Sequence, residues 1–180
     1  MSTAPLQYVR HSLAPDEELI HVGEFHWIYT FSAIMKIVWG IFWAIVIVFA
    51  AYYIETAMMG KVYDGFFDAV RGQHAGVKIL SFLSVVLGMF MFAHMMVHKA
   101  TTEIAVTTSR LIYKRGLIAR YVGEMAIDRI EGVNFLQGIL GRILNYGRVV
   151  VRGMGVGEMV LPPIADPILF RKAIEKAKGA

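Results

Sequence analysis

The sequence changes character between "VVLGMFMFAHMMVH" (residues 85–98) and "SRLIYKRGLIARYVGEM" (residues 109–125). The first stretch is apolar almost throughout, which is typical of a helix surrounded by lipid. The second stretch loosely alternates apolar and basic residues and is broken by Gly116, which is typical of a β-hairpin. This junction predicts the fold class, in which membrane helices at the front of the chain are followed by a small β domain.

The composition agrees with a membrane protein that carries a modest polar part. Hydrophobic residues make up 57% of the chain and charged residues 18%, whereas soluble domains have about 45–50% and about 25%. Cysteine is absent from the sequence, which excludes disulfides, Cys-based zinc sites and thiol catalysis. The first 25 residues contain no apolar core of a signal peptide, so we expect the first apolar segment to be retained.

Two segments are long enough to cross a bilayer, residues 31–54 and about 77–97. A hydrocarbon core about 30 Å thick requires roughly 20 apolar residues in a helix. The small residues Gly88 and Ala93 are of the kind that lets two membrane helices approach closely. We therefore predict a two-helix transmembrane region over residues 31–98, preceded by a leader over residues 1–30.

The two predicted helices are joined by a short loop at about residues 55–76, which is expected to be extracytoplasmic. The loop reads either as a short interfacial helix or as an extension of the first span, and the sequence leaves both open. From Lys99 onward the chain holds thirteen Lys and Arg against seven Asp and Glu. The positive-inside rule therefore predicts a multi-pass protein of the bacterial inner membrane with both termini in the cytoplasm.

The tail predicts several antiparallel strands and one closing helix. Short segments rich in β-branched and aromatic residues alternate with turn residues. A final helix is predicted to begin at Asp166 as N-cap, with Pro167 in the first helical position. Its expected apolar stripe consists of Leu169, Phe170, Ala173, Ile174 and Ala177. Residues 99–180 therefore read as a small barrel or split sheet whose open end the helix would plug.

The segments "EMAIDRIEGVNFLQGILGRILNYGRVVVRGMGVGE" (residues 124–158) and "IADPILFRKAI" (residues 164–174) resemble the bacterial pleckstrin-homology (PH) domain of the YdbS-like, membrane-flanked kind. The leader "YVRHSLAPDEELI" (residues 8–20) resembles a frequent start of that family. The resemblance covers nearly the whole chain. It implies a PH-like split β-barrel with a C-terminal capping helix in the cytoplasm, and it implies no settled activity.

The basic hairpin is the first candidate site. A two-residue turn after Arg115 would pair Arg115 with Ile118 and Tyr113 with Arg120, which leaves Lys114 on the opposite face. Lys114, Arg115 and Arg120 are therefore candidates for binding anionic lipid headgroups. Classical PH domains bind inositol phosphates at such a hairpin, but this is an analogy of fold. The alternative is a solvated edge whose charges prevent strand addition.

The segment "LQGILGRILNYG" (residues 136–147) is the second candidate, because it has more apolar residues than one short turn can bury on a single face. The candidates for an interaction surface are Gln137, Ile139, Leu140, Arg142, Ile143 and Tyr146. The alternative is that the segment only closes the core.

Histidines and glycines raise two further hypotheses. His94 and His98 lie four residues apart on one helix face and His26 is expected near the same interface, which is a possible metal or haem spacing. We expect no cofactor, since no acidic ligand accompanies them in the second span. The run "GMGVG" (residues 153–157) predicts a β-turn, because a phosphate-binding loop would open a helix.

The sequence contains no catalytic constellation, which predicts a protein that is not an enzyme. We expect a membrane-tethered PH-like module that binds a protein partner, anionic lipid headgroups or both. It would act as a scaffold or homo-oligomeric assembly at the inner membrane, with no nucleic-acid partner. The alternatives are a metal- or haem-binding membrane subunit and an accessory subunit of a membrane enzyme or transporter.

Overall fold

The computed structural model describes residues 6–116, 121–155 and 157–179, apart from the side chain of Phe66. The chain divides into two compact units. Met1–Tyr29 and Val97–Ala180 form one unit, called here the strand-rich unit. Thr30–Met96 form the other, called here the helical unit.

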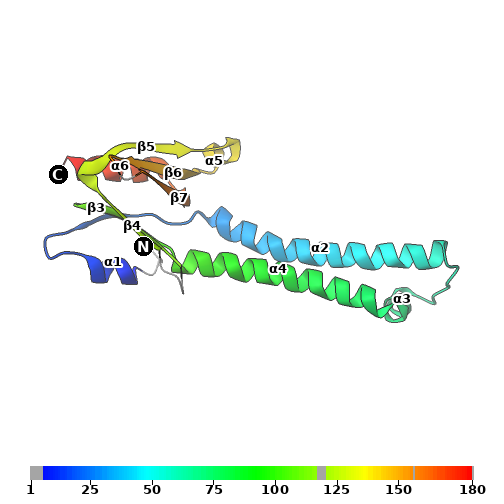
Figure 1. The fold of residues 1–180 in the computed structure, drawn as a ribbon. Coiled ribbons are helices and arrows are strands. Elements are labelled where there is room, and N and C mark those ends of the chain that lie inside the picture. Colours follow the sequence, from blue (N-terminus) through cyan, green and yellow to red (C-terminus); the bar gives the residue numbers. More distant parts are fainter. Residues whose placement is uncertain (1–5, 117–120, 156, 180) are drawn as a thin grey trace. The chain divides into compact units, whose positions relative to one another are not determined.

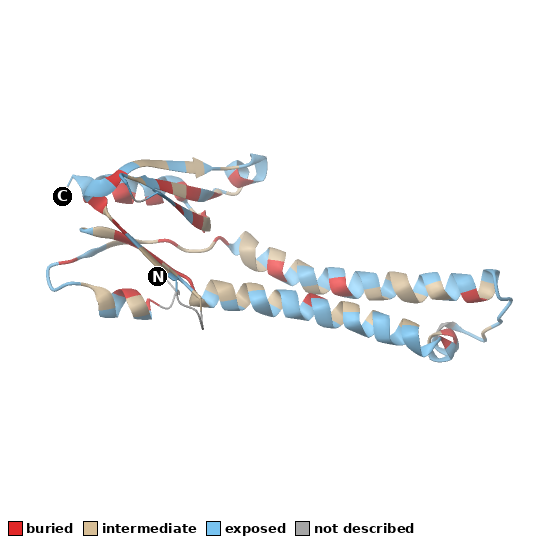
Figure 2. Cartoon of the chain, viewed as in Figure 1, coloured by how far each residue is buried: buried red, intermediate tan, exposed pale blue. Residues whose placement is uncertain are grey.

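The helical unit contains most of two long helices, α2 (Trp27–Ala57) and α4 (Ala75–Thr101), which lie side by side (Figure 1). Both are long and apolar enough to cross a membrane by length and composition. Most of their residues are exposed or half-buried in the isolated chain (Figure 2). The predicted pair of long apolar helices is thus confirmed.

Two glycines bring α2 and α4 into close contact. A Cβ atom on Gly88 would lie 2.6 Å from the carbonyl oxygen of Lys36, and one on Gly40 would lie 2.8 Å from that of Ser84. The Ser84 hydroxyl also donates a hydrogen bond of 2.8 Å to the Gly40 carbonyl. The backbones therefore approach here because neither glycine carries a side chain. Ala93, the other small residue noted in the sequence, is exposed.

The loop between the two long helices contains a separate short helix, α3 (Phe66–Gly72). The structure thus favours a distinct helix over an extension of the first span. The Glu55 carboxylate accepts hydrogen bonds from Tyr63 and Lys61. The Gln73 amide donates a hydrogen bond of 2.9 Å to the Val48 carbonyl. These bonds hold the loop against the end of α2.

The strand-rich unit contains two antiparallel sheets. The first sheet has the order β1 (Leu19–Val22), β2 (Glu103–Thr107), β3 (Arg110–Arg115) and β4 (Tyr121–Ala126). The second has the order β5 (Ile130–Leu136), β6 (Tyr146–Gly153) and β7 (Gly157–Ala165). Its helical elements are α1 (Gln7–Ser12), η1 (Ile127–Arg129), α5 (Ile139–Ile143) and α6 (Pro167–Lys178).

The predicted strands of the tail are confirmed, but the predicted barrel needs correction. The described strands form two separate sheets and no closed barrel. β4 and β5 are consecutive in the chain, yet η1 separates them and they belong to different sheets. The isolated bridge between Phe25 and Ile164 links the segment after β1 to β7.

β1 comes from the segment that the sequence assigned to a leader. It pairs antiparallel with β2, and Val22 lies opposite Ala105. In the sequence, the long helical hairpin therefore lies between β1 and β2, which are neighbours in one sheet. A four-residue strand whose partner lies about 80 residues away gives no local signal, because its pairing is wholly non-local.

The core of the strand-rich unit lies between the sheets and α6. Phe170, Ile174 and Ala177 of α6 are buried against it, as the predicted apolar stripe requires. Leu169 departs from the prediction, since it is 53% exposed. Asp166 occupies the predicted N-cap position, with a left-handed backbone (φ 49°), but its side chain forms no capping hydrogen bond. Its carboxylate accepts a hydrogen bond from the Asn145 amide instead.

The "GMGVG" segment connects β6 to β7 as a hairpin, in which Gly153 lies opposite Gly157. A strand follows it and not a helix. This agrees with the β-turn interpretation of the run.

Candidate binding surfaces

The β3–β4 hairpin has a different register from the one predicted. Arg115 lies opposite Tyr121, and Tyr113 lies opposite Gly123. The predicted two-residue turn is therefore wrong, because residues 116–120 connect the strands. The observed register places the buried residues Leu111 and Met125 opposite each other, and burial on one face is what fixes the register of such a pair.

Lys114 does not offer a free charge at this hairpin. Its ammonium group lies 2.8 Å from the Glu103 carboxylate, and the two side chains are 14% and 3% exposed. The same carboxylate accepts hydrogen bonds from the backbone N–H groups of Tyr8 and Val9. Lys114 therefore neutralises a buried acid that holds the first turn of α1.

Arg115 is exposed, and its guanidinium carbon lies 5.0 Å from the centroid of the Tyr121 ring. Arg120 lies outside the described residues. The structure thus brings together fewer free charges here than the sequence suggested, and lipid binding by Lys114, Arg115 and Arg120 stays a prediction.

Residues 136–146 form a compact turn around α5, called here the α5 turn. The Gln137 amide donates hydrogen bonds to the carbonyls of Tyr146 (3.1 Å) and Gly141 (3.4 Å). A Cβ atom on Gly141 would lie 2.7 Å from the Tyr146 carbonyl oxygen. Gln137 and Gly141 are therefore structural residues that fold the turn tightly.

The α5 turn exposes its apolar side chains. Ile139 is 82% exposed, Ile143 72% and Leu140 63%. These residues do not close the core, and their role as an interaction surface stays a prediction.

The sequence did not single out two exposed residues, Leu136 in the α5 turn and Arg148 in β6. Leu136 is 65% exposed, and it lies directly opposite the exposed Arg148 across β5 and β6. Arg142 is also exposed. Neither arginine forms an ion pair within the described part of the chain. The opposed positions could not be found without the β5–β6 register.

His26 attaches the α5 turn to the start of α2. Its ring stacks on Tyr146, with ring centroids 5.0 Å apart and an interplanar angle of 24°. Burial lowers the pKa of His26, and this effect outweighs its hydrogen bond to the Leu144 backbone and the charge of Asp166. The imidazole is therefore neutral near pH 7 and acts as a packing and hydrogen-bonding group. The next residue, Trp27, begins α2 and is 57% exposed.

The other histidines proposed as metal ligands have different surroundings. His98 lies in the strand-rich unit, where its Nδ1 is 3.4 Å from the Tyr29 hydroxyl and its ring contacts Phe25 edge-on. His94 belongs to the helical unit. Among the residues that the structure describes, no group of three His, Asp or Glu side chains is placed to hold a metal ion.

Comparison with known proteins identifies the family of this chain. The model of the family described as "Bacterial PH domain" matches residues 65–178, more than half of the chain. The match begins after β1, so this strand of the first sheet lies outside it. The search of curated proteins and the search of solved structures found no match. On the family match, the chain belongs to the bacterial PH domain family.

Proposed function

We propose that this protein is a non-catalytic module tethered to the bacterial inner membrane, whose α5 turn binds the anionic lipid surface. Domains of the PH-like kind are generally non-catalytic. One observation carries the proposal: Ile139, Leu140 and Ile143 are exposed on a turn that His26 fastens to the start of α2.

The energetics favour a lipid surface over water for these side chains. Burying a Leu or Ile side chain contributes about 1.5–3 kcal/mol. A basic residue near an anionic surface adds about 1 kcal/mol, which Arg142 and Arg148 are free to supply. Apolar side chains flanked by basic ones are the usual composition of an interfacial anchor.

The pairing of β1 with β2 supports the proposed topology. Because Val22 lies opposite Ala105 in one sheet, the leader and the tail fold together on one side of the membrane. The intervening chain must then cross the bilayer an even number of times, which suits α2 and α4. The excess of Lys and Arg after α4 supports the cytoplasmic side.

The proposal is tested by a fluorescent label on the α5 turn. The chain has no cysteine, so Ile139→Cys provides one unique site for a polarity-sensitive dye. The full chain would be placed in nanodiscs of zwitterionic lipid with or without an anionic lipid. We expect blue-shifted emission and protection from an aqueous quencher, and both should increase with the anionic lipid.

Met154→Cys is the matched control. Met154 is also apolar and 58% exposed, but it follows the opposite end of β6, roughly 25 Å from Tyr146 along the strand. Its label should remain accessible to the quencher. Equal quenching at positions 139 and 154 would contradict lipid binding by the turn. Protection that requires two chains in each nanodisc would assign the turn to a second copy, the scaffold alternative.

A further inference from the structure

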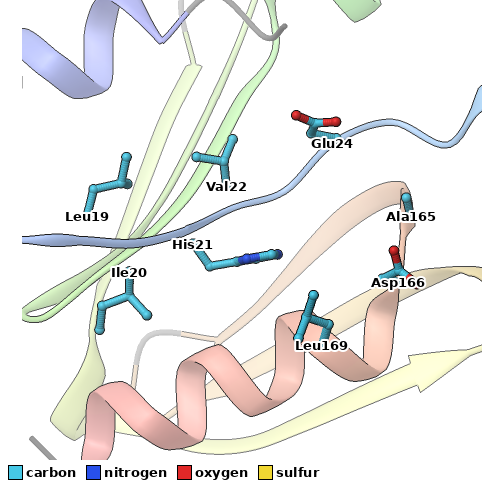
Figure 3. A pocket seen from close by; sticks show the side chains of 8 residues that line it. All are labelled: Leu19, Ile20, His21, Val22, Glu24, Ala165, Asp166 and Leu169. Carbon is cyan, nitrogen blue, oxygen red and sulfur yellow. The ribbon is translucent and has the colours of Figure 1, made fainter. Parts of the chain in front are cut away.

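A groove lies along the free edge of the first sheet, within the strand-rich unit. It has a volume of about 350 Å³ and is lined by Leu19–Val22 and Glu24 on one side and by Ala165, Asp166 and Leu169 on the other. Figure 3 shows the His21 side chain extending from β1 into the space before Asp166 and Leu169. The groove is separate from the α5 turn, and its use does not depend on the lipid binding proposed above.

The backbone of β1 is available for pairing along this groove. β1 is the first strand in the order of its sheet, so only β2 pairs with it there. Gly23 donates a hydrogen bond of 2.9 Å to the Ile104 carbonyl. Antiparallel strands alternate between hydrogen-bonded and non-hydrogen-bonded pairs, so the N–H and C=O of the preceding Val22 point away from β2.

The fold already uses the continuation of this edge in the same way. The Ala165 N–H donates a hydrogen bond of 2.8 Å to the carbonyl of Glu24, which faces the same side as that of Val22. Both residues of this contact also line the groove. An extended chain lying in the groove would therefore continue a pattern of hydrogen bonds that β7 has started.

The side chains that line the groove are partly apolar and partly acidic. Leu19 is 38% exposed and Leu169 53%. Glu24 and Asp166 contribute carboxylates, and neither forms an ion pair among the described residues. Burial lowers the pKa of His21 despite the charges of Asp166 and Glu24, so its imidazole does not neutralise them near pH 7.

We propose that this groove binds an extended peptide segment of a partner protein as an added strand beside β1. The backbone of Val22 would supply the hydrogen bonds, as in other cases of strand addition. A Lys or Arg of the peptide would lie between Glu24 and Asp166, and an apolar side chain would lie against Leu19, farther along β1 (Figure 3). Both side chains must point to one face of the peptide, so they stand at positions i and i+2 or at positions i and i+4.

The test uses a random library of ~7-residue displayed peptides, a length that spans about 23 Å when extended. The library is selected on the full chain in nanodiscs. Val22→Pro removes the outward N–H only, and proline is tolerated in an edge strand where the N–H faces outward. Val22→Ala loses similar packing but keeps the N–H and serves as its control. Glu24→Gln with Asp166→Asn removes the charges, and Asn accepts the left-handed backbone at position 166.

We expect enriched peptides that combine one basic and one apolar residue at even spacing. These peptides should bind Val22→Ala like the original chain. They should bind Val22→Pro and the neutralised groove about tenfold more weakly, the change expected for loss of about one strong hydrogen bond or ion pair. Binding should also slow hydrogen exchange at residues 19–24. Failure to enrich any peptide, or equal binding to Val22→Pro, would overturn the proposal.

Discussion

Glu17 fastens the leader to the first sheet through charged hydrogen bonds. Its carboxylate accepts hydrogen bonds from the Thr107 hydroxyl (2.5 Å) and from two nitrogens of Arg110 (3.1 and 2.9 Å). Arg110 also bonds to Glu124 and to the Ser12 carbonyl. The Glu17 side chain is 3% exposed. A buried carboxylate is stable only when it is paired in this way.

We predict that Glu17→Gln loosens β1 while leaving the second sheet intact. Losing a charged pair should lower the free energy that holds β1 by about 2 kcal/mol, which corresponds to roughly 30-fold faster amide exchange. Hydrogen–deuterium exchange of residues 19–22 measures it. Asp16→Asn is the control, because Asp16 is exposed. Unchanged protection of β1 in Glu17→Gln would show that packing alone holds the leader.

The same contact predicts a dependence on acid. Burial alone would raise the pKa of Glu17, but its hydrogen bonds with Thr107, Ala14 and Arg110 outweigh burial and lower it. Its stabilisation is therefore complete above the unfolded pKa of about 4.3 and is lost as the pH falls through the folded pKa. The difference in β1 exchange between the original chain and Glu17→Gln should be constant at pH 5–8 and should shrink as the pH falls below about 4.3 towards the lowered folded pKa. A difference that does not shrink as the pH falls below that value would contradict this linkage.

At the scale of elements, the contact of α2 with α4 depends on Gly88 and Gly40. Gly88→Leu would force the helices apart, since even a Cβ atom would collide with the Lys36 carbonyl. Overpacking of this kind costs about 1–3 kcal/mol. We expect the thermal midpoint of the full chain in detergent, followed by circular dichroism, to fall by several degrees. Ala93→Leu adds the same side chain at an exposed position and should leave the thermal midpoint unchanged. Equal decreases of the midpoint in the two variants would contradict a specific contact at Gly88.

Elements with a strong local pattern were predictable from the sequence. The two long helices follow from apolar length, and β2 to β7 follow from short β-branched and aromatic runs between turn residues. α6 was also predictable, although Leu169 turned out to be exposed. Periodicity assigns a face, but it does not say whether another element covers it.

The features that escaped prediction depend on pairing between distant residues. β1 has its partner in β2, and the charge of Lys114 is neutralised by Glu103 directly across the β2–β3 pair. The hairpin register and the groove beside β1 likewise require the sheet order. For the candidate sites, the sequence found the apolar residues of the α5 turn, while their attachment through His26 required the structure.

At the scale of the whole molecule, the chain segment that joins the paired strands β1 and β2 contains the helical hairpin. Val22 is the last residue of β1 and lies opposite Ala105, the middle residue of β2. The chain therefore leaves the strand-rich unit and returns to it at the same end of the sheet. In the proposed topology, α2 and α4 would tether the strand-rich unit to the membrane, and weak contacts with lipid or a partner would gain from high local concentration.

The most direct test is the accessibility of single cysteines to a membrane-impermeant maleimide in intact bacterial cells. Asp16→Cys, Val62→Cys and Lys172→Cys report on the leader, the loop and α6, and all three positions are exposed. The account predicts labelling at position 62 in intact cells, and labelling at positions 16 and 172 only after permeabilisation. A labelling pattern that places positions 16 and 172 on opposite sides of the membrane would contradict the account. So would a pattern that places all three positions on one side.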